Sequence, residues 1–279
     1  MFTAINAWSV DKATGFADMF RQIKAAGFAA IELNVDAEGH SEHSLSLQSS
    51  DADLAAVAAL SKEHGLPVCS ISTSLTGGRL GSGLSEDRAF MENLLERQLY
   101  FAKALGANGI LTVPGGIGPS VSIADAFQNA RNMLESLRSL YDMYKLPVGL
   151  ENVWNNFFAS PYDMAAFVDS IGSPWVGAYY DVGNTHAFSV PEYWIEILGS
   201  RISHIHVKGY RKANEKWTNC GGEFVDTLDC GIRWDRVFTA LRQNGYKGAV
   251  TAEISKKNPD ESFEAFYARI AAEMRGYIA

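Results

Sequence analysis

The segments LPVGLENVW (residues 146–154) and SPWVGAYYDVGN (residues 173–184) decide the fold of this chain of 279 residues. Each contains a short, largely apolar run that ends in a carboxylate, Glu151 in the first and Asp181 in the second. Between them, Pro161–Ile171 has the apolar spacing of a helix, and Gly172 and a following proline end it. A strand, a helix and a second strand with short joins predict parallel strands with a right-handed crossover.

The same alternation recurs along the whole chain. The expected strands are Thr3–Trp8, Ala30–Val35, Val68–Thr73, Gly109–Val113, Val148–Val153, Val176–Asp181, Ile202–Lys208 and Ala249–Ile254. The expected helices are Ala13–Ala26, Asp51–His64, Glu86–Leu105, Ile123–Tyr144, Pro161–Ile171, Pro191–Leu198, Trp234–Asn244 and Ser262–Met274. This rhythm predicts one α/β domain over residues 1–279, a closed (β/α)8 barrel. An open doubly wound sheet is disfavoured because no Gly-x-Gly-x-x-Gly follows the first strand. The long segment Gly209–Gly231 is expected to be a functional loop.

Composition narrows the function. A hydrophobic share of 47% can form a large core, and a net charge of −8 argues against a nucleic-acid partner, which would favour a basic chain. The N-terminus lacks a signal peptide, and no apolar run is long enough to cross a membrane. Three cysteines without zinc-finger spacing indicate reduced thiols. We therefore expect a cytoplasmic protein acting on a small molecule, and a homo-oligomer is left open.

Four consecutive strands carry a polar residue near their carboxyl ends, where barrel enzymes place their active sites. These residues are Glu151, Asp181, His206 and Glu253. Because side chains alternate along a strand, His206 shares the face of Lys208, opposite to the apolar residues between them. The sequence predicts that all four project into the mouth of the barrel.

Three carboxylates at one rim repel each other unless a cation joins them. With one imidazole they form an oxygen-rich ligand set that suits Mn²⁺, Mg²⁺ or Co²⁺, with Zn²⁺ as an alternative. An ion pair at a strand end explains any one of them alone, whereas four at equivalent places favour one divalent metal. Such an ion could polarise a sugar carbonyl and stabilise an ene-diolate. Glu151 and Glu253, on strands separated by two others, could then exchange protons, giving epimerisation from opposite faces or isomerisation on one face.

Several motifs resemble the xylose-isomerase-like superfamily of sugar-phosphate isomerases and epimerases. They are ENVWNN (151–156), YDVGN (180–184), HIHVK (204–208) and AEI (252–254), with IELNVD (31–36), RLGS (79–82) and Trp234-Asp235 leading into residues 241–247. The chain is most similar to the branch of L-ribulose-5-phosphate 3-epimerase and hexulose-phosphate isomerase. This resemblance implies an enzyme in which the four residues bind the metal and both glutamates act as acid and base. That branch usually has an acidic residue at Gly209 and an aromatic one at Ser255, so the exact sugar is not carried over.

The resemblance also suggests substrate-binding residues. Glu32 is expected near the substrate or Glu151. His186 lies within a residue or two of a histidine that contacts substrate in related ketose 3-epimerases, and Arg211 or Lys212 lies where related epimerases have a substrate-binding arginine. A loop histidine and a solvated surface pair explain them about equally well. Trp8 and Trp154 are expected to wall the pocket or pack at its rim. The pairs at 77–78 and 115–116, both Gly-Gly, could hold a phosphate with backbone amides or could simply serve turns.

Other activities remain open on this scaffold. An apurinic-site endonuclease, a phosphodiesterase, has the same barrel but needs a histidine-rich multi-zinc site and a basic groove. Six histidines and a charge of −8 disfavour it. A barrel that only binds carbohydrate would not need two opposed glutamates. A dehydratase or lyase could use the same ene-diolate.

Overall fold

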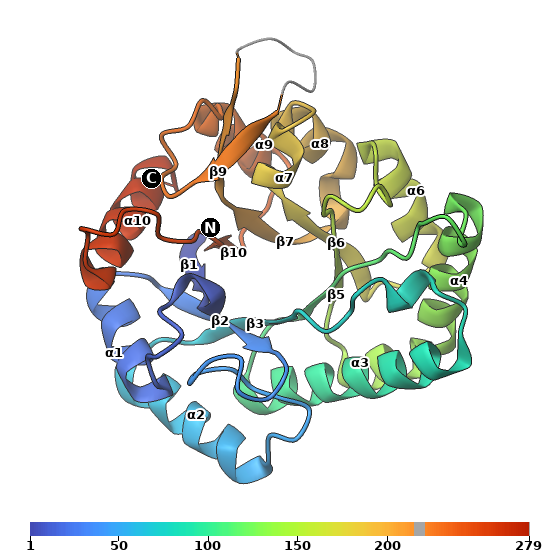
Figure 1. Ribbon diagram of the computed structural model, residues 1–279, viewed down its shortest axis with the longest axis horizontal. Helices are drawn as coiled ribbons and strands as arrows, with labels where there is room; N and C mark the ends of the chain where they lie inside the picture. Colours follow the sequence, from blue (N-terminus) through green and yellow to red (C-terminus); the bar gives the residue numbers. More distant parts are fainter. Residues whose placement is uncertain (215–220, 279) are drawn as a thin grey trace.

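The computed structural model describes residues 1–214 and 221–278 and shows a closed barrel of eight parallel strands ringed by helices (Figure 1). Around the barrel the strands follow the order β1, β10, β7, β6, β5, β4, β3, β2. The barrel strands are β1 (Phe2–Asn6), β2 (Ala30–Val35), β3 (Val68–Thr73), β4 (Ile110–Thr112), β5 (Val148–Glu151), β6 (Val176–Asp181), β7 (Ile202–Val207) and β10 (Ala249–Ala252). The predicted barrel is confirmed.

The expected helices are present with ends that differ by a few residues, and the short helix Val182–His186 was not expected. They are α1 (Phe16–Ala26), α2 (Asp51–His64), α3 (Ser85–Leu105), α4 (Ile123–Ser136), α5 (Arg138–Tyr144), α6 (Pro161–Ile171), α7 (Val182–His186), α8 (Pro191–Leu198), α9 (Trp234–Gln243) and α10 (Phe263–Ile278). Short 3-10 turns occupy Ala7–Ser9, Arg79–Gly81 and Gly199–Arg201. Gly27, Gly65 and Gly106 end helices in the left-handed conformation, as their positions in the sequence suggest.

One expected helix, Ile123–Tyr144, is divided in two. Leu137 separates α4 from α5 with ψ near 5°. Just before it, the Ser136 hydroxyl donates to the carbonyl of Met133, at 2.8 Å. A serine that bonds back to the preceding turn competes with the helix ladder, and here the ladder is interrupted at that point.

The barrel separates an apolar layer from a polar lumen. Ile205 and Val207 on β7 have no exposed surface and belong to the core between strands and helices, whereas His204 and His206 face Tyr179 inside the barrel. Gly149 makes room for that tyrosine, because a β-carbon at Gly149 would lie 2.9 Å from the Tyr179 side chain. The predicted alternation of faces is therefore confirmed.

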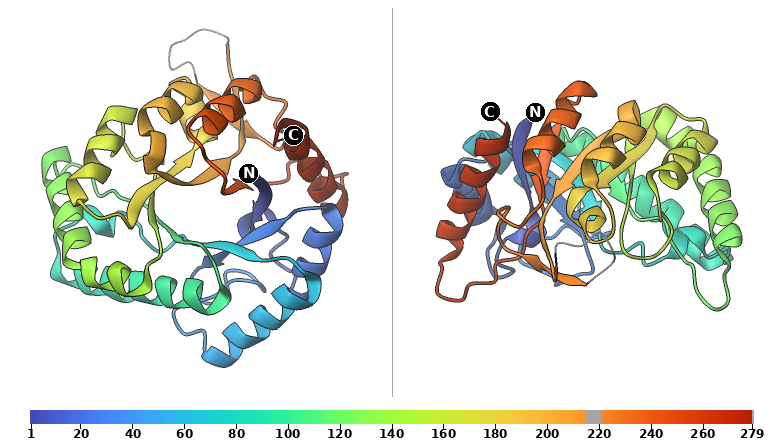
Figure 2. Two further views of the ribbon diagram at one scale, coloured as in Figure 1. Left: turned by 180° about the vertical axis from the view of Figure 1, so that it is seen from behind. Right: turned by 90° about the horizontal axis from the view of Figure 1, so that it is seen from above.

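The segment expected to be a loop contains an antiparallel pair, β8 (Gly209–Lys212) with β9 (Gly222–Val225). This β8–β9 hairpin lies at the end of the barrel opposite the N-terminus (Figure 2). The expected long loop therefore includes two paired arms, and residues 215–220 lie outside the described part. Among the described residues no helix is long and apolar enough to cross a membrane.

Candidate metal centre

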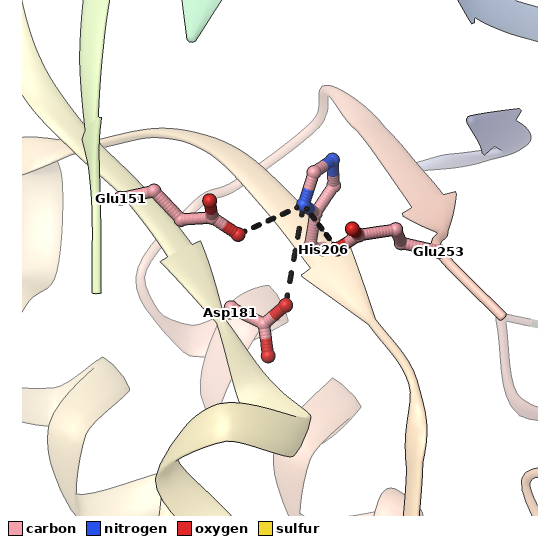
Figure 3. Close-up of side chains that lie close together, drawn as sticks. All are labelled: Glu151, Asp181, His206 and Glu253. Carbon is pink, nitrogen blue, oxygen red and sulfur yellow. Dashed lines mark hydrogen bonds and ion pairs between the residues drawn. The ribbon is translucent and has the colours of Figure 1, made fainter. Parts of the chain in front are cut away.

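The ends of four neighbouring strands bring Glu151, Asp181, His206 and Glu253 together (Figure 3). Glu151 and Asp181 are the last residues of β5 and β6, His206 lies near the end of β7, and Glu253 follows β10 directly. The register pairs Asp181 with His206, and His206 with Thr251 on β10. Glu151 pairs with Tyr179, two residues before Asp181, and Glu253 lies two residues beyond Thr251. The four side chains thus meet on the side of the β8–β9 hairpin because neighbouring strands of the tilted barrel are staggered.

The donor atoms converge on the Nδ1 atom of His206. Its distances are 3.2 Å to Glu151 Oε1, 3.2 Å to Glu253 Oε2 and 4.0 Å to Asp181 Oδ2. One ligand atom from each of the four residues lies within 4.8 Å of the others. Ligands about 2.0–2.2 Å from a divalent ion lie roughly 3–4 Å from one another, so a small contraction closes this shell around one ion. His206 and Asp181 are fully buried, whereas the Glu253 side chain is 22% exposed and opens toward solvent.

Electrostatics favour a cation here. Burial raises the pKa of Glu151 to about 7 and also raises the pKa of Asp181. Burial acts in the same direction on Glu253, but Lys208 and His206 outweigh it and hold its pKa below the usual range. The Lys208 ammonium lies 3.0 Å from Asp181 Oδ2 and 2.7 Å from Glu253 Oε2. The three carboxylates exceed the single ammonium by two negative charges, and the buried Glu32 adds another, so a divalent ion would reduce the charge imbalance and the residues present fit such an ion.

Glu32 lies beneath this cluster and is fully buried. Its Oε1 is 2.7 Å from Nε2 of His206 and also accepts from Asn6, while Oε2 accepts from Ser70 and Tyr179. Burial alone would raise the pKa of Glu32, but these partners, His206 foremost, lower it overall. Burial would lower the pKa of His206, but the facing carboxylates Glu32, Glu151 and Glu253 outweigh it and raise that pKa well above its usual value. An ionised Glu32 only accepts, so Nε2 keeps its proton, and Nδ1 would offer its lone pair to a metal that displaces the proton there. Glu32 therefore contacts His206 and, being fully buried, is not positioned to contact a substrate.

Two asparagines from the recognised motifs hold the strand ends. The Asn152 side chain accepts from the Asp181 backbone N–H at 2.7 Å and donates to the Asp181 carbonyl at 2.9 Å. The Asn184 amide donates to the carbonyl of Asn152, and its backbone N–H donates to Oδ1 of Asp181. These bonds fix β5 against β6 where Glu151 and Asp181 leave the sheet. The sequence analysis quoted both asparagines within motifs but gave them no role.

Two of the cavities at this end of the barrel lie beside the β8–β9 hairpin. The inner cavity, about 230 Å³, touches the cluster, and its lining comprises Trp8, Ser9, Lys208, Phe224, Val225, Glu253, Ile254, Ser255 and Lys257. The outer cavity, about 470 Å³, is lined by Val153, Trp154, Asn156, Phe158, Ala159, Ala187, Phe188, Tyr210, Gly221 and Gly222. The inner cavity is where a small substrate can reach Glu253.

Two of the expected substrate residues border these cavities, one in each. Trp8 borders the inner cavity, and its indole donates to Asp36 at 3.0 Å. Trp154 borders the outer one, and the ring of His186 packs edge-on against Tyr210 there. Burial lowers the pKa of His186 to about 4. Arg211 is exposed on β8, bonds to the carbonyl of Asp229 at 3.5 Å, and is not among the described residues lining either cavity.

The two Gly-Gly pairs are explained by close packing. A β-carbon at Gly78 would lie 3.3 Å from the backbone of Gly116, and one at Gly81 would lie 1.8 Å from the carbonyl oxygen of Gly115. The loops after β3 and β4 therefore pack backbone against backbone. This contact explains why glycines occur in both loops. The glycines therefore do not support a phosphate site.

Sequence reasoning left two residues out of the site. The sequence pattern places Lys208 on the same strand face as His206, which indicates that it lies near the site. The pattern does not indicate which carboxylates its long side chain contacts. No sequence pattern indicates that Phe224 lies near the site. It comes from β9, and the Lys208 ammonium lies 5.4 Å from the centre of its ring.

Comparison with known proteins agrees with this geometry. Residues 20–271 match the family described as xylose isomerase-like TIM barrel, and the chain belongs to that family. A comparison with curated proteins gives no match.

Solved structures with a similar fold include 3-keto-D-glucoside 4-epimerase from E. coli, at 17% identity and TM-score 0.76, covering 98% of each chain. D-psicose 3-epimerase from Clostridium cellulolyticum H10 is similar at 15% identity and TM-score 0.79, covering 100% of this chain and 99% of that one. L-ribulose 3-epimerase is similar at 18% identity and TM-score 0.77, covering 99% and 94%. At these identities the likeness concerns the fold.

Proposed function

We propose that the protein is a metal-dependent epimerase or isomerase of a ketose or ketose phosphate, with Glu151 and Glu253 as its acid and base. The observation that carries this proposal is the convergence of both glutamates on one side chain, His206, from opposite sides of it (Figure 3). β6 and β7 lie between their strands. The fold neighbours named above, all sugar epimerases, support the same chemistry.

The reaction follows from the two carboxylates. One glutamate removes the proton α to the substrate carbonyl, and the electron pair of the broken C–H bond moves onto the carbonyl oxygen to give an ene-diolate. The other returns a proton on the opposite face, which inverts the carbon. A divalent ion held by Glu151, Asp181, His206 and Glu253 would polarise that carbonyl. Mn²⁺, Mg²⁺ or Co²⁺ suits the ligand set best, and Zn²⁺ is the alternative.

The remaining residues receive supporting roles. Trp8 walls the inner cavity, and Glu32 acts through His206. Trp154 and His186 lie on the outer side, where they meet whatever part of the substrate extends beyond the inner cavity. Arg211 on the hairpin would bind a phosphate that reaches its exposed edge. The L-ribulose-5-phosphate branch, a cytoplasmic location and a homo-oligomer remain parts of this proposal.

The experiment is a panel of free and phosphorylated ketoses in D2O with each metal. Deuterium at C3 indicates epimerisation, and deuterium at C1 or C2 indicates isomerisation. Glu151→Gln and Glu253→Gln should each lower kcat by about 10²–10⁴-fold or more while the barrel stays folded. Glu192→Gln, a buried glutamate on α8 paired with Arg236 at 3.8 Å, is the matched control and should keep full activity. Near wild-type turnover by either site variant refutes the two-carboxylate scheme.

Two other reactions are distinguished by their products. A phosphodiesterase would cleave duplex DNA at an abasic site in the presence of metal, and no cleavage is expected. A dehydratase or lyase would release water or split the carbon chain, so the product would have a different mass from the substrate. An epimer or isomer has the same mass.

A further inference from the structure

The outer cavity is lined with aromatic side chains that the proposed reaction does not need. Trp154 and Phe188 contribute to its wall while remaining 53% and 36% exposed. Phe158 and Tyr210 border it from the loop after β5 and from β8. Exposed apolar groups that gather in one concavity mark a binding site more often than a neutral stretch of surface.

This cavity shares a wall with the inner one. Trp154 of the outer cavity stacks on Phe224 of the inner cavity, with ring centres 4.9 Å apart and planes inclined by 25°. Tyr210 meets the same Phe224 ring edge-on, at 5.3 Å. Lys208 and Tyr210 are two residues apart along the chain and border the inner and outer cavity respectively. A molecule that fills the inner cavity is therefore one aromatic layer away from the outer one.

The outer wall is held in place and includes a polar group. The indole N–H of Trp154 donates to the carbonyl of Asn184 at 2.9 Å, which fixes the plane of the exposed ring. Asn156, which also borders the cavity, has a φ of +61°, a left-handed conformation uncommon outside glycine. An aromatic platform beside an amide suits a ring with one apolar face and hydroxyl groups at its edge.

We propose that the outer cavity is a subsite for the second ring of a glycoside whose keto-sugar ring reacts at the metal centre. This rests on the proposed function and names the substrate class for it. The inner cavity of about 230 Å³ is smaller than the roughly 300–1,000 Å³ usual for ligand sites, whereas the outer one, at about 470 Å³, lies within that range. The inner space suits one sugar ring, and the outer space adds room for a second.

Binding of two unreactive glucosides to the metal-loaded protein tests the subsite. Phenyl β-D-glucopyranoside adds an aromatic ring to a sugar, and methyl β-D-glucopyranoside lacks that ring. We expect the phenyl compound to bind at least about tenfold more tightly, measured by NMR titration, because its ring is removed from water. Phe188→Ala should remove most of this preference. Ala159→Trp, at an exposed position on the cavity wall, should remove it by filling the space.

Tyr162→Ala is the control, since this aromatic is 68% exposed and is not among the described residues lining the outer cavity. It should keep the preference for the phenyl compound. Equal binding of the two glucosides, or a preference that survives both cavity variants, overturns the subsite. Turnover of a simple ketose without any phenyl preference refutes the subsite and leaves the proposed function standing. A phenyl preference in a protein that turns over no keto sugar supports the subsite and refutes the function.

Discussion

Replacing Glu32 by Gln tests whether a carboxylate beneath the cluster fixes the metal-binding nitrogen of His206. The carboxylate accepts at one oxygen from His206 and Asn6 and at the other from Ser70 and Tyr179. An amide can keep only one accepting side. If its NH2 group faces His206, the imidazole must turn to the tautomer that carries its proton on Nδ1, which cannot bind a metal. If its oxygen faces His206, the bond persists but loses the charge that makes the ring a better ligand.

The expected effect is a loss of metal affinity rather than of fold. Removing a group that orients a ligating histidine lowers metal affinity by about 10–100-fold. Metal at a thousand times its Kd stabilises a protein by about 4.1 kcal/mol, and a tenfold weaker site gives about 2.7 kcal/mol at the same concentration. Because 1 kcal/mol corresponds to roughly 2–4 °C in a chain of this size, the rise in Tm caused by Mn²⁺ should shrink by about 3–6 °C for each tenfold.

The assay is thermal unfolding with and without Mn²⁺, together with a calorimetric titration of the metal. Asp36→Asn is the matched control, because Asp36 is a second buried carboxylate directly after β2 and accepts from Trp8, Ser44 and Ser74. The control should keep its metal affinity. If the Glu32→Gln variant binds Mn²⁺ as tightly as the wild type, Glu32 does not orient His206 and the reasoning fails.

Three further perturbations follow from the structure. Lys208→Met should lower the free energy of unfolding by about 3–5 kcal/mol without metal, because buried carboxylates lose their ammonium partner. Added Mn²⁺ should raise the free energy of unfolding of this variant by more than it raises that of the wild type. An unchanged Tm without metal would contradict this expectation. Cys69 is buried, which raises the pKa of its thiol to about 12, so at pH 8 the neutral thiol should resist iodoacetamide until the protein is unfolded, as mass spectrometry of its peptide would show. Gly81→Ala should lower the free energy of unfolding by about 1–3 kcal/mol in urea, since its β-carbon would meet the carbonyl of Gly115; a stability equal to that of the wild type would mean the loops separate freely.

The sequence predicts the barrel and the cluster because both depend on local periodicity. A run that alternates along a strand gives the face of each residue, and parallel strands in register bring equivalent positions to one level. That is sufficient to place Asp181 beside His206. The division of a helix at Leu137 escapes such reasoning, because it coincides with one side-chain hydrogen bond from Ser136 that competes with the helix ladder.

Contacts between distant segments are the part that sequence does not supply. Trp154 and Phe224 stack although the elements from α6 to β7 and part of the hairpin lie between them along the chain. The sequence around either residue does not predict its contact with the other. The wall between the two cavities therefore becomes visible only once the β8–β9 hairpin is in place, and with it the outer cavity.

The start of the hairpin explains why the family resemblance predicts the type of reaction better than it predicts the substrate. The branch that the sequence motifs resemble usually has an acidic residue at Gly209, but here a β-carbon at that position would lie 2.0 Å from the carbonyl oxygen of Thr227. No side chain fits unless the hairpin moves away, so glycine at this position and the placement of Tyr210 and Phe224 depend on each other. The residues of the candidate metal centre lie on the barrel strands or directly after one, not on the hairpin. Residues of the hairpin line both cavities, so we expect the shape of these cavities to differ in proteins with a side chain at position 209.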